Sequence, residues 1–142
     1  MNAPKGSLRD KYHIVFCPKY RFRIFEGEIA EYTKQQIYKI CDQKDLIEVL
    51  DLSVMNDHIH QVLSIPPKYS ISSLMGYLKG NLSTHIFHRY VHIGKKYWGR
   101  HQWSRGYCVS TVGLDEDKIR KYVRWQEDNE KQIESQQIGL FK

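Results

Sequence analysis

The sequence has no long hydrophobic run and no paired-cysteine motif. No apolar stretch approaches the roughly 18 residues of a membrane-spanning helix, and the opening MNAPKGSLRDKYH has neither an apolar signal core nor a cleavage pattern. The three cysteines, Cys17, Cys41 and Cys108, are odd in number, far apart and without CxxC spacing. We therefore expect no membrane or export function, and reduced core cysteines in a cytosolic protein.

The length and composition predict one basic globular domain that spans residues 1–142. This length suits a single compact core. Lys and Arg number 22 against 16 Asp and Glu, which gives a net charge of +6, and 13% of the residues are aromatic. Cations interleaved with flat rings suit a polyanion whose bases can be stacked. A solvated basic surface would have the same net charge, so charge alone identifies no partner.

Residue periodicity predicts a repeating order of strands and helices. Strict alternation marks strands, and apolar residues three or four apart mark amphipathic helices. The predicted elements are a strand at 11–19, a helix at 28–44, a hairpin of strands at 46–55 and 58–65, a helix at 70–90 and a strand at 107–112. This order predicts an α+β fold of the ferredoxin-like β-α-β-β-α-β type, an antiparallel sheet with helices on one face.

Several local features refine this prediction. The alternation slips near Val49 and Leu50, which indicates a β-bulge, and Ser70 is placed to cap the helix that follows it. The basic, aromatic segment 92–106 has no period and is predicted to be a loop. A last helix is predicted over 114–134, with three acidic residues in its first turn, where the helix dipole favours carboxylates.

The strand within DHIHQVLSIP carries two histidines separated by one residue. Because strand side chains alternate, His58 and His60 share a face, roughly 7 Å apart, while Ile59 points the other way. This geometry suits the binding of one metal ion. A single histidine on a strand is more often an ordinary polar side chain, so the pair needs support from elsewhere in the chain.

The last helix supplies that support, because Tyr122 and Gln126 stand four residues apart on nearly one face, about 6 Å along the axis. A phenol, with a pKa of about 10, is deprotonated more readily than a serine hydroxyl, which suits Tyr122 to attack a phosphodiester. A metal held by the two histidines needs a further ligand, and the Gln126 carbonyl is a candidate. Glu127 and Asp128 are alternative ligands nearby.

Four segments together resemble a known family: DHIHQVLSIPPKYS, GYLKGNLS, GRHQWSRGYCVSTVG and KIRKYVRWQE. They are similar to the TnpA transposases of the smallest bacterial insertion sequences, which are single-tyrosine members of the HUH nuclease superfamily. HUH denotes histidine, hydrophobic residue, histidine, here His58, Ile59 and His60. The resemblance extends from KYHIVFCPKYR to the helix that carries Tyr122.

This resemblance implies a ferredoxin-like homodimer that cuts and rejoins single-stranded DNA and recognises hairpins near the ends of the element. By analogy Tyr122 is the nucleophile, forms a 5′-phosphotyrosine and frees a 3′-hydroxyl, while His58, His60 and Gln126 bind Mg²⁺ or Mn²⁺. In the family the tyrosine helix can serve the partner's histidines, which gives composite active sites. The resemblance also implies a cytoplasmic, nucleoid-associated protein of a bacterium or archaeon.

Basic and aromatic residues are the candidates for contacts with DNA. Phosphate contacts would position the strand, and Trp98 and Trp103 would stack on unpaired bases. Solvated charge and core tryptophans explain these residues equally well, and the five other histidines are assigned to structure or surface. The basic candidates are Lys19, Arg21, Arg23, Lys79, Arg89 and Arg105, with Lys95, Lys96 and Arg100 in the aromatic segment.

Three alternative functions stay open at this point. A domesticated relative would process chromosomal palindromic repeats and would lack matching hairpins on both sides of its gene. A non-catalytic nucleic-acid-binding module would use the same ferredoxin-like sheet without cleavage. A histidine-metal phosphodiesterase that uses water would cleave DNA without a covalent intermediate.

Overall fold

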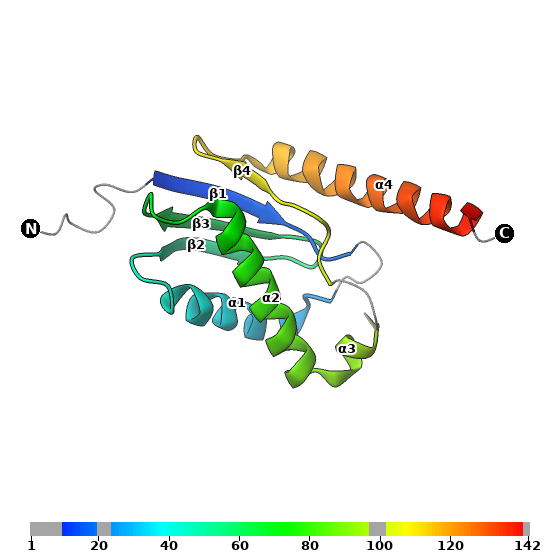
Figure 1. Cartoon of the computed structure of the whole chain (residues 1–142), viewed down its shortest axis with the longest axis horizontal. Coiled ribbons are helices and arrows are strands. Elements are labelled where there is room, and N and C mark those ends of the chain that lie inside the picture. The colour runs from blue at the N-terminus through cyan, green and yellow to red at the C-terminus, as the bar shows by residue number, and fades with distance from the viewer. Residues whose placement is uncertain (1–9, 20–23, 97–101, 141–142) are drawn as a thin grey trace, which may run out of the picture.

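A computed structural model of the chain describes residues 10–19, 24–96 and 102–140, apart from the side chains of Lys96, Glu134 and residues 137–140. Four strands form one antiparallel sheet in the order β2-β3-β1-β4 (Figure 1). This order confirms the predicted α+β fold. The strands are β1 (Asp10–Phe16), β2 (Glu48–Val54), β3 (Ile59–Ile65) and β4 (Cys108–Ser110), and the helices are α1 (Gly27–Asp42), α2 (Ile71–Arg89), α3 (Val91–Lys96) and α4 (Glu116–Leu140).

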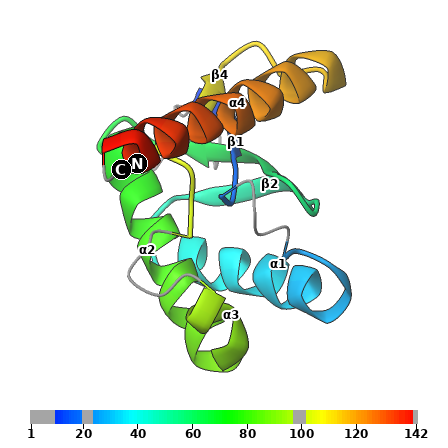
Figure 2. The same ribbon diagram turned by 90° about the vertical axis from the view of Figure 1, so that its right-hand side faces the viewer.

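Helices cover both faces of the sheet. Figure 2 shows α1 and α2 on one side and α4 on the other. Alternation along β1 explains this arrangement, because Ile14 and Phe16 belong to the main core under α1 and α2, whereas Val15 packs on the opposite side. The second apolar cluster consists of Val15, Cys17, Ile119 and Val123, and the last two lie on α4. The sheet therefore carries α4 on the face that also receives His60.

The hairpin of β2 and β3 brings the histidine segment into the middle of the sheet. The pairing register shifts between Val49 and Asp51, which confirms the predicted bulge. The backbone N–H of Met55 donates to the carbonyl of His58 over 2.9 Å and closes the turn. Downstream, the Ser70 hydroxyl accepts a hydrogen bond from the Ser73 N–H over 3.0 Å, so the predicted cap of α2 is also confirmed.

Three predicted elements differ from the structure. The segment 92–106 is not a loop throughout, because residues 91–96 form α3. Ile93 explains this helix, since its side chain is 1% exposed and anchors the segment in the main core. Six residues are too few for a helical period to be visible in the sequence. The strand expected at 107–112 is limited to Cys108–Ser110, and the last helix extends six residues further than expected.

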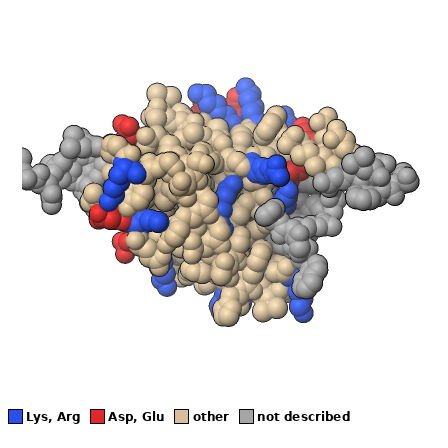
Figure 3. All heavy atoms as spheres, in the orientation of Figure 1, with Lys and Arg blue, Asp and Glu red and all other residues tan. Residues whose placement is uncertain are grey.

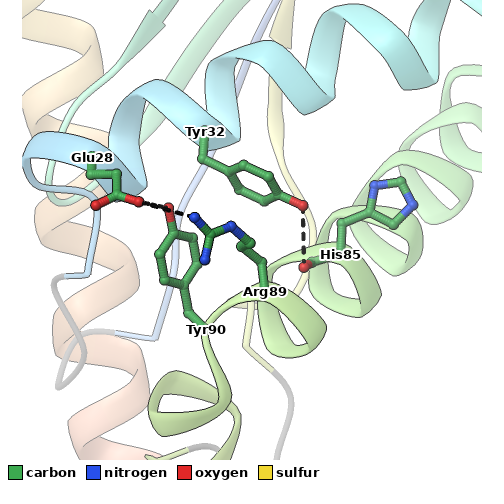
Figure 4. A network of polar contacts seen from close by, with 5 residues as sticks. All are labelled: Glu28, Tyr32, His85, Arg89 and Tyr90. Carbon is green, nitrogen blue, oxygen red and sulfur yellow. Dashed lines mark hydrogen bonds and ion pairs between the residues drawn. The ribbon is translucent and has the colours of Figure 1, made fainter.

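A network of polar contacts joins α1 to α2 (Figure 4). Glu28 accepts hydrogen bonds from Arg89 over 3.4 Å and from the Tyr90 hydroxyl over 3.2 Å. The Tyr32 hydroxyl donates to the carbonyl of His85 over 3.4 Å. Exposed ion pairs of this kind contribute about 1 kcal/mol or less. Arg89, a candidate DNA contact, thus has an ion pair within the protomer that an approaching phosphate would have to replace.

Candidate active site

The histidine pair lies on the α4 side of the sheet. Ile59 is fully buried in the main core, and His60, its neighbour on β3, points to the opposite face, as strand alternation predicts. His58 immediately precedes β3 and lies in the same layer as α4, because it lines a pocket together with Ile119 and Val123 of that helix. The two imidazoles therefore lie between the sheet and the helix that carries Tyr122.

His58 is oriented by the carboxylate of Asp57. The Nδ1 atom of His58 lies 2.8 Å from Oδ1 of Asp57, and both side chains are partly exposed. When Nδ1 donates this hydrogen bond, the lone pair of the neutral ring is on Nε2. A carboxylate that orients a histidine in this way is a common companion of histidine metal ligands. His58 is thus prepared to bind a metal through Nε2.

His60 has a buried nitrogen that needs a partner. Its Nε2 atom is inaccessible to solvent and has no hydrogen-bond partner among the described residues. Burial lowers the pKa of His60, and the neighbouring His13 and His58 lower it further. The lowered pKa favours the neutral imidazole, the form that binds metals. These properties fit a metal ligand.

His13 is a third histidine at this site that the sequence did not indicate. Its ring lies 5.7 Å from the ring of His60, centroid to centroid, at an angle of 34°. The contact arises because Val15 pairs with His60, so that His13, two residues away on β1, projects from the same face. The register of β1 against β3 creates this neighbour. No spacing within the sequence could reveal it, and the sequence alone predicts only a structural or surface role for His13.

Tyr122 and Gln126 are in contact on α4, as their spacing predicts. The Gln126 Nε2 donates to the Tyr122 hydroxyl over 2.6 Å and to the carbonyl of Arg105 over 2.9 Å. Both contacts use the amide nitrogen, and neither uses the carbonyl oxygen that would bind a metal. Burial raises the pKa of Tyr122 to about 12, although the hydrogen bond from Gln126 acts in the opposite direction. The phenol is therefore protonated at neutral pH.

Tyr122 lies on one flank of α4, and the pocket at His58 lies beside the other flank. Successive residues are about 100° apart around a helix, so Tyr122 and Arg120 fall on opposite sides of the buried stripe through Ile119 and Val123. Tyr122 packs against the second apolar cluster, where Cys108 is also found. The pocket at His58 is lined instead by Asp57, Ile119, Arg120, Val123, Arg124 and Glu127.

Within one protomer, therefore, the described residues do not form a complete site. The hydrogen bonds of Gln126 go to Tyr122 and to the carbonyl of Arg105, and neither goes to a histidine. In the described part of the chain, no three His, Cys, Asp or Glu side chains are placed to hold one metal ion. Glu127, an alternative ligand, lines the pocket at His58. Asp128 lines a different pocket further along α4.

Two buried polar contacts fasten α4 to the segment before β4. The first is the bond from Gln126 to the carbonyl of Arg105, and the second joins the Ser104 hydroxyl to the carboxylate of Glu130. Ser104 and Glu130 are both buried. The N–H of Ser104 donates in turn to the carbonyl of Cys17 over 2.8 Å. The position of α4 is thus set by contacts that connect it to the end of β1.

Lys79 supports this same segment. Its ammonium donates to the carbonyls of Ser104 over 3.2 Å and of Gly106 over 2.6 Å. Burial lowers the pKa of Lys79 to about 8. The lysine was predicted to contact DNA, and the structure gives it intramolecular partners near Gln126.

The other predicted DNA contacts are distributed unevenly. Lys19 lines a small cavity beside Gln126, and Arg105 is exposed. Figure 3 shows Lys and Arg side chains spread over the visible face, several of them along its upper edge. Trp103 is 7% exposed and packs on Phe16 and Phe25, which favours its role as a core residue. Outside the described residues lie Arg21, Arg23, Trp98 and Arg100.

Sequence similarity identifies the family to which the chain belongs. Residues 8–126 match the family described as "Transposase IS200 like". The chain belongs to this family. The transposase of insertion sequence element IS200 from Salmonella typhimurium (strain LT2) is 42% identical over 128 residues, which cover 90% of this chain and 84% of that protein. The ISDra2 transposase TnpA of Deinococcus radiodurans is 36% identical over 121 residues, 84% and 86% of the two chains.

Solved structures agree with this membership. A crystal structure from Deinococcus radiodurans R1, described as that of a candidate transposase, superposes with a TM-score of 0.75 and 28% identity, and covers 89% of this chain and 98% of the other. A REP-associated tyrosine transposase bound to a REP hairpin superposes with a TM-score of 0.51 and 16% identity, over 87% and 66% of the two chains, and shares the fold. In the described part of this IS200-like transposase, no helix is long and apolar enough to cross a membrane.

Proposed function

We propose that this IS200-like transposase is a metal-dependent enzyme that cuts and rejoins single-stranded DNA at the hairpin-bearing ends of an insertion sequence. The reaction proceeds through a 5′-phosphotyrosine at Tyr122. The observation that carries this proposal is the placement, within the family match, of Tyr122 and its hydrogen-bonded Gln126 on the helix that covers the histidine face of the sheet. A nucleophile and candidate metal ligands thus occur in one layer.

The ligands of the proposed metal are His58, His60 and Gln126, with Mg²⁺ or Mn²⁺ as the ion. The Asp57 carboxylate that orients His58 and the unpartnered Nε2 of His60 support this assignment. The ion would polarise the non-bridging oxygens of the scissile phosphate and stabilise the charge that develops on them. An imidazole pair suits Mn²⁺ better than Mg²⁺, which prefers oxygen ligands.

The chemical step exchanges one phosphodiester for another. The Tyr122 oxygen forms a bond to phosphorus, the bond from phosphorus to the 3′ oxygen breaks, and that oxygen leaves as a 3′-hydroxyl. The phenolic proton passes, directly or through solvent, to the 3′ oxygen that leaves as a hydroxyl. Gln126 donates a hydrogen bond to the phenol oxygen and so stabilises its anionic form. Rejoining is the reverse step, in which a 3′-hydroxyl attacks the phosphotyrosine and Tyr122 leaves.

The active enzyme in this proposal is a homodimer with composite sites. Within a protomer, the flank of α4 that bears Tyr122 is turned away from the pocket at His58. When Gln126 exchanges its hydrogen bond to the Arg105 carbonyl, a second protomer can present its own Tyr122 and Gln126 to these histidines. Each site then combines the histidines of one protomer with the tyrosine helix of the other.

A covalent-adduct assay tests the function. Single-stranded DNA with the hairpin and flank found beside the gene is labelled at its 3′ end and incubated with protein and Mn²⁺. Wild type should form an adduct that survives denaturing electrophoresis, and Tyr122→Phe should form none. Tyr38→Phe is the matched control, because Tyr38 lies on the exposed side of α1 and should leave the adduct unchanged.

This gel and a hairpin-binding assay separate the non-catalytic and water-using alternatives. An adduct with Tyr122→Phe would show that another residue is the nucleophile. Cleaved DNA without any adduct would indicate attack by water. Hairpin binding without cleavage, at any metal concentration, would indicate a non-catalytic nucleic-acid-binding module, and each of these results overturns the proposal.

A further inference from the structure

Trp125 is an exposed tryptophan beside the proposed nucleophile. Its side chain is 59% exposed, whereas Trp103 is buried in the core. Tryptophan is highly buried on average in folded proteins, so this exposure is unusual. Trp125 lies within the turn of α4 between Tyr122 and Gln126. The sequence alone gives no reason to expect its exposure.

The indole of Trp125 is oriented by Tyr122. The two ring centroids are 6.3 Å apart and the ring planes differ by 24°, a nearly parallel arrangement. Viewed down the axis of α4, Tyr122 lies at the edge of the buried stripe, and Trp125 lies further from that stripe, on the solvent side of Tyr122. The contact holds the indole in place and leaves most of its surface accessible. A flat ring is therefore presented to solvent next to the phenol that attacks DNA.

The surroundings of Trp125 are polar and include a lysine. Lys121 lies one helical turn before Trp125, on its outer side. Its ammonium pairs with Asp117 over 3.5 Å, and both side chains are 77% exposed, so the pair is weak and a phosphate can replace it. The other helix neighbours of Trp125 are Asp128, Asn129 and Gln132. These neighbours on the solvent side are polar or charged and not apolar, which suits a nucleic acid at the indole.

We propose that Trp125 stacks on a nucleobase of the nucleotide that flanks the scissile phosphate, while Lys121 contacts the neighbouring backbone phosphate. This inference rests on the proposed function, since it takes Tyr122 as the nucleophile. Stacking on an aromatic ring tolerates any base, so Trp125 positions the strand and does not select its sequence. The role of Trp125 is to bind and align substrate beside the attacking oxygen.

The experiment measures binding of a hairpin oligonucleotide that carries 2-aminopurine at one of the two positions flanking the cleavage site. Wild-type protein should quench its fluorescence, and Trp125→Ala should not. We expect Trp125→Ala to weaken binding of the cleavage-site strand on the order of tenfold to a hundredfold, and Trp125→Phe to retain most of the affinity. Ile133→Ala, which changes another exposed apolar residue of α4, should bind as wild type.

An abasic oligonucleotide completes the test. When the stacked base is absent, wild type and Trp125→Ala should bind equally. The inference is overturned if Trp125→Ala binds intact DNA as wild type does. It is also overturned if the variant's loss of affinity persists when the base is removed at either of the two positions that flank the cleavage site. Loss of the dimeric state of the variant, measured by light scattering, would overturn it as well.

The binding measurement is independent of the chemistry. Because no cleavage is needed, quenching can be measured with Tyr122→Phe, in which Trp125 is unchanged. Failure of the adduct assay with wild type would refute the proposed nucleophile and leave the quenching result standing. Conversely, a lost quenching signal in Trp125→Ala bears only on the base contact, because the adduct assay of Tyr122 is made with Trp125 unchanged.

Discussion

Burial and one hydrogen bond determine the protonation state of Tyr122. The phenol packs against the second apolar cluster, and this environment raises its pKa to about 12. Gln126 partly opposes the shift by donating to the phenol oxygen. In this arrangement the proposed nucleophile is not ionised at neutral pH. Its attack on DNA would therefore need a group or solvent molecule that takes up the phenolic proton.

The raised pKa can be measured in the absence of metal and DNA. With ¹³Cζ-labelled tyrosine, the resonance that Tyr122→Phe removes should keep the chemical shift of a phenol up to about pH 11. The pKa of Tyr122 in the folded state exceeds the unfolded value of about 10. The contribution of the protonated phenol to the free energy of unfolding is therefore complete below pH 10 and is lost as the pH rises through 12. Tyr122→Phe should lack this alkaline loss. A titration midpoint at or below pH 10 would contradict the account.

At the scale of elements, α4 owes its position to its polar fastening as well as to its apolar stripe. Ser104 and Gln126 each connect α4 to the segment before β4, and Ser104 also connects that segment to β1. Each such hydrogen bond adds only modestly to the free energy of unfolding. Removing one partner costs more, because the other polar group is then buried without a hydrogen bond. The helix that carries the proposed nucleophile is thus sensitive to changes remote from Tyr122.

Ser104→Ala tests this fastening. The substitution deprives the Glu130 carboxylate of the Ser104 hydroxyl, and we expect a loss of about 1–3 kcal/mol in the free energy of unfolding. Urea denaturation followed by circular dichroism gives this value. Ser72→Ala, on the exposed side of α2, should change stability by less than about 0.5 kcal/mol. Equal stability of the two variants would show that the Ser104 contact does not hold α4.

The long periodic elements could be predicted from the sequence, and the short ones could not. The amphipathic stripes of α1 and α2 and the bulge near Val49 are encoded within their own segments. The helix α3 depends on Ile93 entering a core built by other segments, and β4 is limited to the three residues that pair with β1. Tertiary contacts, which sequence periodicity does not contain, determine both.

The same distinction applies to the site. The spacing of residues along the sequence predicts that His58 and His60 share a face and that Tyr122 lies beside Gln126. His13 could not be found, because its contact with His60 depends on strand register. The exposure of Trp125 depends on which stripe of α4 is buried.

The arrangement of the whole molecule bears on which protomer supplies the nucleophile. The sheet has α1 and α2 on one face and α4 on the other (Figure 2). One flank of α4 bears Tyr122, and the other flank faces the pocket at His58. A single protomer therefore separates the tyrosine from the histidines, and the proposed dimer reunites them.

Subunit complementation tests this composite site. Tyr122→Phe and His58→Ala should each be inactive alone. In a mixed dimer with sites shared between protomers, one site combines intact histidines with an intact tyrosine, so mixing should restore roughly a quarter of wild-type cleavage. If each protomer used its own tyrosine, every site in the mixture would carry a defect. Absence of restored activity, with mixed dimers demonstrated by tag capture, would refute the shared site.

In the proposed reaction, Tyr122 becomes covalently joined to the 5′ phosphate of the cut strand. The most direct test of this step is mass spectrometry of wild-type protein after reaction with single-stranded hairpin DNA and Mn²⁺, followed by nuclease and protease digestion. The account predicts that the peptide containing Tyr122 carries a residual 5′-linked nucleotide on its phenolic oxygen. A nucleotide attached to any other residue, or cleaved DNA with an unmodified Tyr122 peptide throughout the reaction, would contradict it.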